Sequence, residues 1–216
     1  MRRLNTTDSR NRIELWTKYH LRRLLSHPKS QPLGAALQPV RERYVSAVGV
    51  VAELSFEQQV LTGSITGEDS LFDPILSLIN DHLLLGVGKN RDSEVYRSFY
   101  PSGRLQESTR APSIEDPKIA ERIAAAAKAH PNMVPDSQVT ELVEVGARIA
   151  ELISKAEANA SALANANLAL ELATIPLVRL YNENFHQLRL LFPEREAFVE
   201  SFYLRTAKST KQDDEA

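Results

Sequence analysis

Three short blocks of sequence recur in the same order about a hundred residues later in the chain. They are HPxxxP at 27–32 and 130–135, P-[IL]-[LV]-x-L-x-N-[DE] at 74–81 and 176–183, and Ser-Phe-Tyr at 98–100 and 201–203. The copies are 103, 102 and 103 residues apart, so single-residue gaps are enough to align them. A fixed period is typical of a structural unit built more than once. The blocks predict a tandem duplication of a helical hairpin module, with one module at 1–103 and a second at 104–206.

Apolar residues recur mostly three and four positions apart, which is the period of an α-helix, and no sustained alternation typical of strands is present. This spacing predicts helices at 10–27, 37–61, 72–85, 117–130 and 194–205, and a short helix at 94–100. Residues 62–67 contain two glycines, each of which weakens a helix by ~1 kcal/mol relative to alanine, so we expect a break there. The alignment of the two copies leaves one alternative open, which is a single long kinked helix in each copy.

The longest apolar seam runs from Leu142 to Leu177 and has the spacing of a coiled coil. Alanine and asparagine are frequent in its middle, where a partner helix can approach closely. Pro176 predicts a kink or a helix restart, followed by helix to Leu191. Together these features predict an all-α fold, an antiparallel bundle of four long helices with short extra helices.

The composition argues against several classes of function. The chain of 216 residues has no cysteine, which excludes disulfides, thiolate zinc sites, iron–sulfur clusters and cysteine nucleophiles. Its formal net charge of -2 argues against nucleic-acid binding. No secretory signal and no run of ~18 apolar residues is apparent, so we expect a cytoplasmic protein without a membrane span. Residues 207–216 are polar and predict a disordered tail.

One pair of residues on a predicted helix has the spacing of metal ligands. Glu183 and His186 are three residues apart and therefore share a helix face. Asp81 and His82 occupy the corresponding stretch of the first copy, so a pseudo-twofold axis would bring the four together as a mixed site for zinc or another divalent ion. A di-iron site needs the Glu-x-x-His spacing twice, and the first copy does not repeat it. The alternative interpretation is four solvated polar positions, and no cofactor is predicted.

The first 29 residues carry a local excess of positive charge. This segment contains two acidic residues, Asp8 and Glu14. It contains eight basic residues, which are Arg2, Arg3, Arg10, Arg12, Lys18, Arg22, Arg23 and Lys29. One interpretation is that the helix predicted at 10–27 binds an anionic partner through these basic residues. The other is that they form a solvated face of this helix, while Trp16 anchors the helix to the core. The two Ser-Phe-Tyr triplets could close the ends of the bundle or form an aromatic docking surface, and we favour closure.

No nucleophile motif or other catalytic signature is present. The sequence therefore favours a non-catalytic structural or protein-interaction bundle, whose partner is an unknown protein or another copy of the chain. Two alternatives remain open: a bundle that binds a divalent metal or a small ligand, and a binder of an anionic partner through the basic N-terminal helix.

Overall fold

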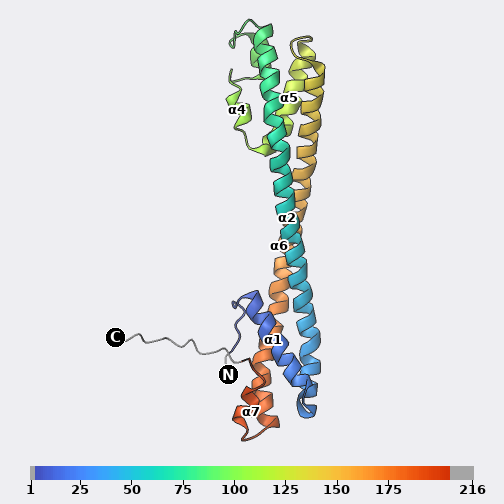
Figure 1. Ribbon diagram of the computed structural model, residues 1–216, viewed down its shortest axis with the longest axis vertical. Helices are drawn as coiled ribbons and strands as arrows, with labels where there is room; N and C mark the ends of the chain where they lie inside the picture. Colours follow the sequence, from blue (N-terminus) through green and yellow to red (C-terminus); the bar gives the residue numbers. More distant parts are fainter. Residues whose placement is uncertain (1–2, 205–216) are drawn as a thin grey trace, which may run out of the picture. The chain divides into compact units, whose positions relative to one another are not determined.

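The computed structural model describes residues 3–204, and every regular element in this range is a helix (Figure 1). The elements are α1 Arg10–Leu25, η1 Pro28–Ser30, α2 Gln31–Gly86, α3 Glu94–Phe99, α4 Gln106–Thr109, η2 Ser113–Glu115, α5 Asp116–Ala129, α6 Asp136–Leu191 and α7 Glu196–Glu200. The all-helical prediction is confirmed. The tail predicted at 207–216 lies outside the described residues.

The helix α2 is continuous, so the break predicted at 62–67 is wrong. A Cβ atom added to Gly63 or Gly67 would meet nothing within 4 Å, which means that both glycines are tolerated on an open helix face. Leu61 and Phe72 on either side are buried, with 6% and 0% of their surface exposed. Burying such side chains contributes ~1.5 to 3 kcal/mol each, which outweighs the ~1 kcal/mol cost of each glycine.

The helix α6 also contains 56 residues and runs through Pro176, so two long helices replace the four that the sequence predicted. A proline inside a helix removes one hydrogen bond and costs ~3 kcal/mol. The residues that follow Pro176 offset this cost, because Leu177 and Tyr181 are fully buried. A restart at Pro176 is therefore wrong, whereas the predicted end of this helix at Leu191 is confirmed.

The described residues form two compact units. Unit 1 contains residues 3–53 and 163–204, and unit 2 contains residues 54–162. Each of the long helices α2 and α6 contributes one segment to each unit. A unit thus combines the first half of one predicted module with the second half of the other, and the module boundary at 103 and 104 stays a prediction.

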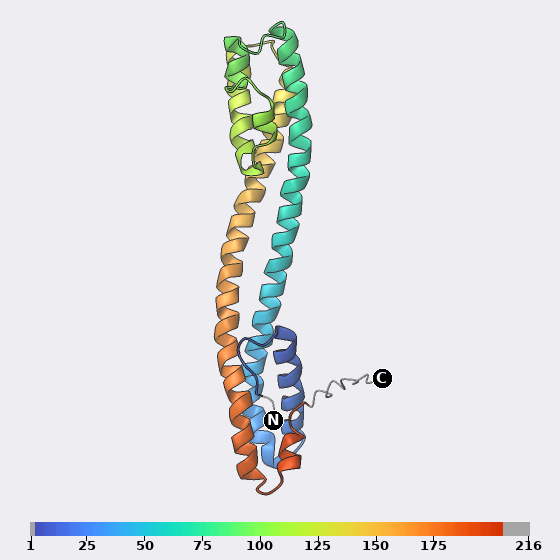
Figure 2. The ribbon, with the colours of Figure 1, turned by 90° about the vertical axis from the view of Figure 1, so that its left-hand side faces the viewer.

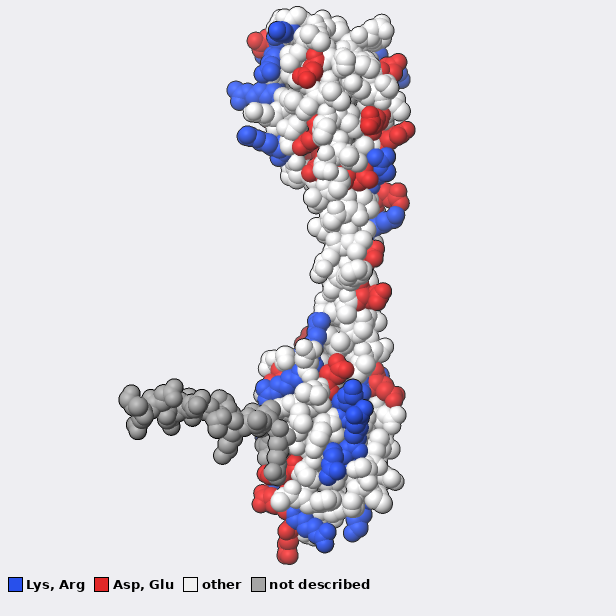
Figure 3. All heavy atoms as spheres, in the orientation of Figure 1, with Lys and Arg blue, Asp and Glu red and all other residues white. Residues whose placement is uncertain are grey.

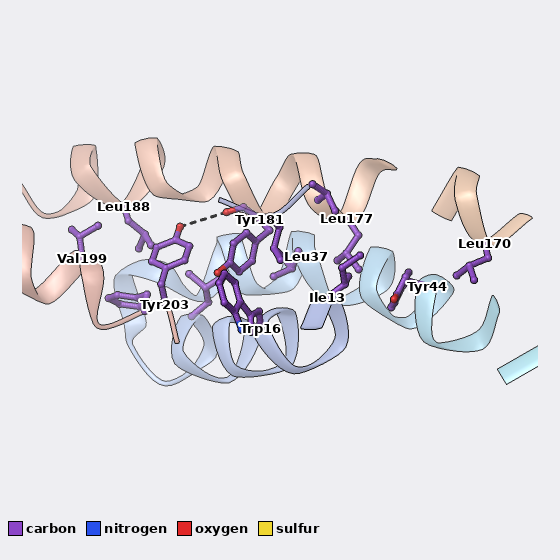
Figure 4. Close-up of a cluster of buried hydrophobic side chains, with 14 of the residues drawn as sticks. Ile13, Trp16, Leu37, Tyr44, Leu170, Leu177, Tyr181, Leu188, Val199 and Tyr203 are labelled. Carbon is purple, nitrogen blue, oxygen red and sulfur yellow. Dashed lines mark hydrogen bonds between the residues drawn. The ribbon is translucent and has the colours of Figure 1, made fainter. Parts of the chain in front are cut away.

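In unit 1, α1 lies along the segments of α2 and α6 that belong to this unit, and α7 closes one end (Figures 1 and 2). Figure 4 shows the side chains that fill the space between them. Trp16 is 3% exposed, which confirms its predicted role as a core residue. The core consists of Leu4, Ile13, Trp16, Leu24, Leu37, Tyr44, Val51, Leu170, Leu177, Val178, Tyr181, Leu188, Phe192, Val199, Phe202 and Tyr203.

Unit 2 is built from α3, α4, η2, α5 and the remaining segments of α2 and α6. Gly146 on α6 allows α5 to approach closely, because a Cβ atom there would lie 2.9 Å from the Cβ of Ala120. The core consists of Phe72, Ile75, Leu76, Ile79, Leu83, Tyr96, Phe99, Tyr100, Ile119, Ala120, Ile123, Ala126, Val134, Leu142, Val145 and Ile149.

The two Ser-Phe-Tyr triplets bury their aromatic rings in the two units. Phe99 and Tyr100 are 0% and 1% exposed in unit 2, and Phe202 and Tyr203 are 1% and 4% exposed in unit 1. The hydroxyl of Tyr100 donates to a main-chain carbonyl of α2, and that of Tyr203 donates to a carbonyl of α6. The triplets therefore close their units, as favoured from the sequence, and present no aromatic docking surface.

Corresponding positions of the two units can be read from these contacts. In α1 the buried residues 13, 16, 17 and 20 correspond to 116, 119, 120 and 123 in α5, each 103 residues later. The tyrosine hydroxyls bond Leu76 in unit 2 and Tyr181 in unit 1, which are 105 residues apart, as are the ends of α2 and α6. Within the long helices, corresponding positions are therefore 105 residues apart in the sequence. The two copies of the proline block are 102 residues apart, so the two separations differ by about one helical turn.

Candidate interaction groove

The four residues of the predicted metal site are exposed and belong to different units. Asp81 and His82 lie on α2 in unit 2, whereas Glu183 and His186 lie on α6 in unit 1. Glu183 forms an ion pair with Arg179, with 3.7 Å between Oε1 and Nε. Among residues 3–204, no group of three or more histidine, cysteine, aspartate and glutamate side chains is arranged to hold a metal ion. The metal site stays a prediction without a supporting cluster.

The basic N-terminal helix uses three of its arginines inside unit 1. Arg10 donates to Oδ1 of Asn167 at 3.3 Å. Arg12 pairs with Asp8 at 3.0 Å and lies 4.3 Å above the centre of the Trp16 ring. Arg23 donates to the carbonyl oxygen of Ser201 at 3.3 Å and to its hydroxyl at 3.1 Å. Figure 3 shows positive and negative side chains interspersed on the visible face of each unit. The anionic partner stays a prediction, and these contacts give the arginines a structural role.

His20 is a fully buried polar residue that no sequence pattern marked as buried. Its Nδ1 lies 3.0 Å from the carbonyl oxygen of Phe202, and its Nε2 lies 3.2 Å from Nδ2 of Asn184. A carbonyl can only accept, so Nδ1 carries the proton and Nε2 accepts from Asn184. Burial lowers the pKa of His20 to about 4, although the bond to Phe202 favours the charged form. Both nitrogens are occupied, so the imidazole stabilises unit 1 and has no lone pair available for a substrate.

An open groove lies in unit 1 between α2 and α6. Its volume is about 790 Å³, and its lining combines small and apolar side chains with one acid and one base. The lining consists of Pro39, Val40, Glu42, Arg43, Ser46 and Ala47 from α2, and Ala169, Leu172, Ala173 and Pro176 from α6. On each helix these positions recur three and four apart, so they form one stripe per helix.

The covered side of the same two helices faces α1. Leu37 and Tyr44 of α2 are buried at 0% and 1% exposure, with Ile13 of α1 in the same core. With 100° of rotation per residue, Arg43 lies about 110° and Ser46 about 170° around the axis of α2 from the side that carries Leu37 and Tyr44. The groove therefore opens on the flank of the α2 and α6 pair that α1 leaves uncovered.

Unit 2 has a charged contact at the place that corresponds to the groove. Arg148 and Glu68 form an ion pair across α6 and α2, with 3.0 Å between Nε and Oε2. They lie 105 residues from Arg43 and Ala173, respectively. In unit 1 an alanine thus replaces the glutamate, and none of the ion pairs among the described residues includes Arg43. Among the described residues, the groove of unit 1 therefore has no ion pair across the two helices at this position.

Large apolar side chains stand exposed beside the groove. Leu172 lines the groove and is 62% exposed, and Leu168 and Val50, each four residues from the lining residues Leu172 and Ser46, are 56% and 49% exposed. Consistent with this, α6 contains a stretch of 18 residues that is apolar enough, by length and composition alone, to cross a membrane, and 22% of that stretch is buried. No uninterrupted apolar run in the sequence indicates this stretch, because Asn165, Asn167 and Glu171 interrupt the apolar residues of α6.

No protein-family model, curated protein or solved structure matches this chain.

Proposed function

We propose that the chain is a non-catalytic interaction protein that binds an amphipathic helix of a protein partner in the groove of unit 1. The observation that carries this proposal is the groove of about 790 Å³ beside the half-exposed Leu168 and Leu172. A helix that presents apolar residues at i, i+3, i+4 and i+7 fits such a groove, since its side chains follow the same spacing as the two stripes. Unit 2 has the ion pair between Arg148 and Glu68 at the corresponding place, which favours unit 1 as the binding unit.

The alternative is that these exposed apolar side chains insert into a lipid bilayer. The polar content of α6 favours protein over lipid. Asn165, Asn167 and Glu171 lie among the exposed leucines, and each would be costly in hydrocarbon. The groove also contains Glu42 and Arg43, which can form hydrogen bonds at a wet protein interface but not in lipid. A protein partner and a cytoplasmic location follow as parts of the proposal, and recovery of the protein with floating neutral lipid vesicles would overturn both.

The sequence blocks and the matching elements also support a tandem duplication. We infer that each copy contributes one helical hairpin module, which consists of a short helix, a proline turn, a long helix and a closing aromatic segment. The shared order of α1, α2 and α3 with α5, α6 and α7 supports this origin, as does the 103-residue spacing of the buried positions in α1 and α5. It also makes unit 2 a natural internal control for unit 1.

A label in the groove tests the helix-docking function. The chain has no cysteine, so Ser46→Cys provides a single attachment site for an environment-sensitive fluorophore. The probe is a designed amphipathic peptide with leucines at i, i+3, i+4 and i+7. We expect a saturable blue shift of the emission as the peptide excludes water from the groove. The same label at Glu151→Cys, the corresponding position of unit 2, should not respond.

Closing the groove provides the matched variant. Ala173→Glu places a carboxylate opposite Arg43, as Glu68 lies opposite Arg148 in unit 2. We expect peptide affinity to fall by about tenfold or more, while the far-UV circular dichroism and the fluorescence of Trp16 stay unchanged. Peptide binding that is equally strong in the Ala173→Glu variant would overturn the proposed function.

A further inference from the structure

We infer that the helix-docking face of unit 1 binds the same face of a second copy of the chain, which makes the protein a symmetric homodimer. This inference rests on the proposed function, because it names the partner of the same groove. A twofold interface is formed by one surface that is complementary to itself. The groove face meets this requirement in its charges and in its shape.

The charges of the groove are one acid and one base at adjacent positions. Glu42 accepts a hydrogen bond from the neutral amide of Gln38 at 2.8 Å, and it takes part in none of the ion pairs found among residues 3–204. Arg43 takes part in none of the ion pairs found among the described residues. When two copies of α2 meet antiparallel about an axis between positions 42 and 43, Glu42 of each copy faces Arg43 of the other. Two equivalent ion pairs then form, and the interface has no net charge from these groups.

The shape of the groove is also complementary to itself. Small side chains line its floor, namely Ser46, Ala47, Ala169 and Ala173, and Leu172 lines the same groove with 62% of its surface exposed. Such a leucine is a knob beside a hole made by small residues, which is the arrangement that packs helices in coiled coils. Leu172 of each copy can therefore enter the hole of the other.

Other occupants fit the face less well. The chain outside the described residues at the C-terminus, 205–216, has the sequence RTAKSTKQDDEA and contains no large apolar residue to fill the groove. A strongly charged partner has no single-sign surface to bind there, because Glu42 and Arg43 balance each other. A second copy supplies both the apolar knob and the opposite charges.

Sedimentation equilibrium of the full chain over a series of concentrations tests the homodimer. We expect the wild-type protein to be dimeric at high concentration. Glu42→Arg gives the face two positive charges and Arg43→Glu gives it two negative charges, and each variant alone should dimerise about tenfold or more weakly, because like charges then meet across the axis. Ala173→Glu should weaken the dimer as well, because Arg43 is then held within its own chain.

Mixing the two charge variants supplies the decisive result. One partner then carries two positive charges and the other two negative charges, so both ion pairs can form again. An equimolar mixture should recover dimers of about wild-type affinity, which also shows that both variants are folded. A wild-type chain that is monomeric at every concentration, or a mixture that stays monomeric, would overturn the inference.

The two proposals can fail separately. If the designed peptide binds at Ser46→Cys but the wild-type chain remains monomeric, the helix-docking function stands and the second copy is wrong. If the chain dimerises but Ala173→Glu has no effect on the dimer, the dimer uses another face and this inference is overturned. If both hold, the peptide should compete with dimerisation, since both occupy the same groove.

Discussion

His20 and Asn184 form a hydrogen-bonded pair in unit 1, whereas the corresponding positions in unit 2 are Ile123 and Ile79. The two units therefore fill these corresponding buried positions differently, with a hydrogen-bonded polar pair in unit 1 and two apolar side chains in unit 2. A buried polar pair is stable only when every donor and acceptor has a partner, and the Phe202 carbonyl completes this set. A single histidine in a helix rich in arginine carries no sequence signal of burial, so this network could not be predicted before its partners were known.

Burial of neutral His20 predicts that unit 1 loses stability in acid. The histidine takes up a proton at its ordinary pKa of 6.5 when the chain is unfolded, but only at about 4 when it is folded. This contribution to stability is complete above pH 6.5 and is lost as the pH falls towards 4. Between pH 7 and pH 5 we expect a loss of about 2 kcal/mol, at 1.36 kcal/mol per pH unit. Trp16, the only tryptophan, reports the unfolding of unit 1 in urea.

Two variants isolate the effect of His20. His20→Gln keeps an amide that can donate to the Phe202 carbonyl but does not titrate, and it should remove most of this pH dependence. His186→Gln, at an exposed histidine, should keep the wild-type profile. An unchanged pH profile in His20→Gln would show that His20 is not the group responsible.

At the scale of the elements, the length of α2 depends on its surroundings more than on its own residues. Gly63 and Gly67 lower its helix propensity, yet buried residues on both sides keep it helical. The boundaries at His27-Pro28 and at Leu191 were predictable, because proline and turn residues act locally. The continuity of α2 and α6 was not predictable, because it depends on the helix that each one packs against.

Replacing the glycines of α2 with alanine should stabilise the protein. Nothing lies within 4 Å of a Cβ atom added at Gly63 or Gly67, so each substitution should gain up to ~1 kcal/mol of helix propensity without a clash. Urea unfolding followed by far-UV circular dichroism measures the gain. Gly146→Ala is the matched control, because its Cβ would lie 2.9 Å from Ala120 and should destabilise unit 2. Loss of stability in Gly63→Ala would contradict this account of α2.

At the scale of the whole molecule, the two units are expected to respond to pH in opposite directions. Asp116 in unit 2 corresponds to the apolar Ile13 in unit 1 and is only 2% exposed. Burial is the largest of the causes that together raise its pKa to about 7, and the others are a hydrogen bond to Asp69 and the negative charges of Asp69 and Asp73. The folded state thus prefers a protonated Asp116, which disfavours the folded form at higher pH.

The contribution of Asp116 to the free energy of unfolding changes with pH in the opposite direction to that of His20. Its stabilising effect is complete below pH 3.8, the ordinary pKa of the group, and is lost as the pH rises to about 7. Amide hydrogen exchange, corrected for intrinsic rates, should therefore show falling protection in α5 as the pH rises from 4 to 7. Asp116→Asn should flatten this profile and leave that of α1 in unit 1 unchanged. Equal profiles for the wild type and Asp116→Asn would exclude Asp116 as the cause.

The sequence by itself determined the helical class, the positions of the proline turns and the aromatic segments, because these depend on local spacing and on backbone restrictions. It did not determine which segment of α2 packs with which segment of α6, because apolar stripes of similar composition can pair in several ways. The groove was not predicted from the sequence either: its lining comes from segments of α2 and α6 that are far apart in the chain, and only the packed helices place Ala173 at the position that corresponds to Glu68 of unit 2. The tertiary structure decided these features because long-range contacts, and not local propensity, choose the partner of each helix face.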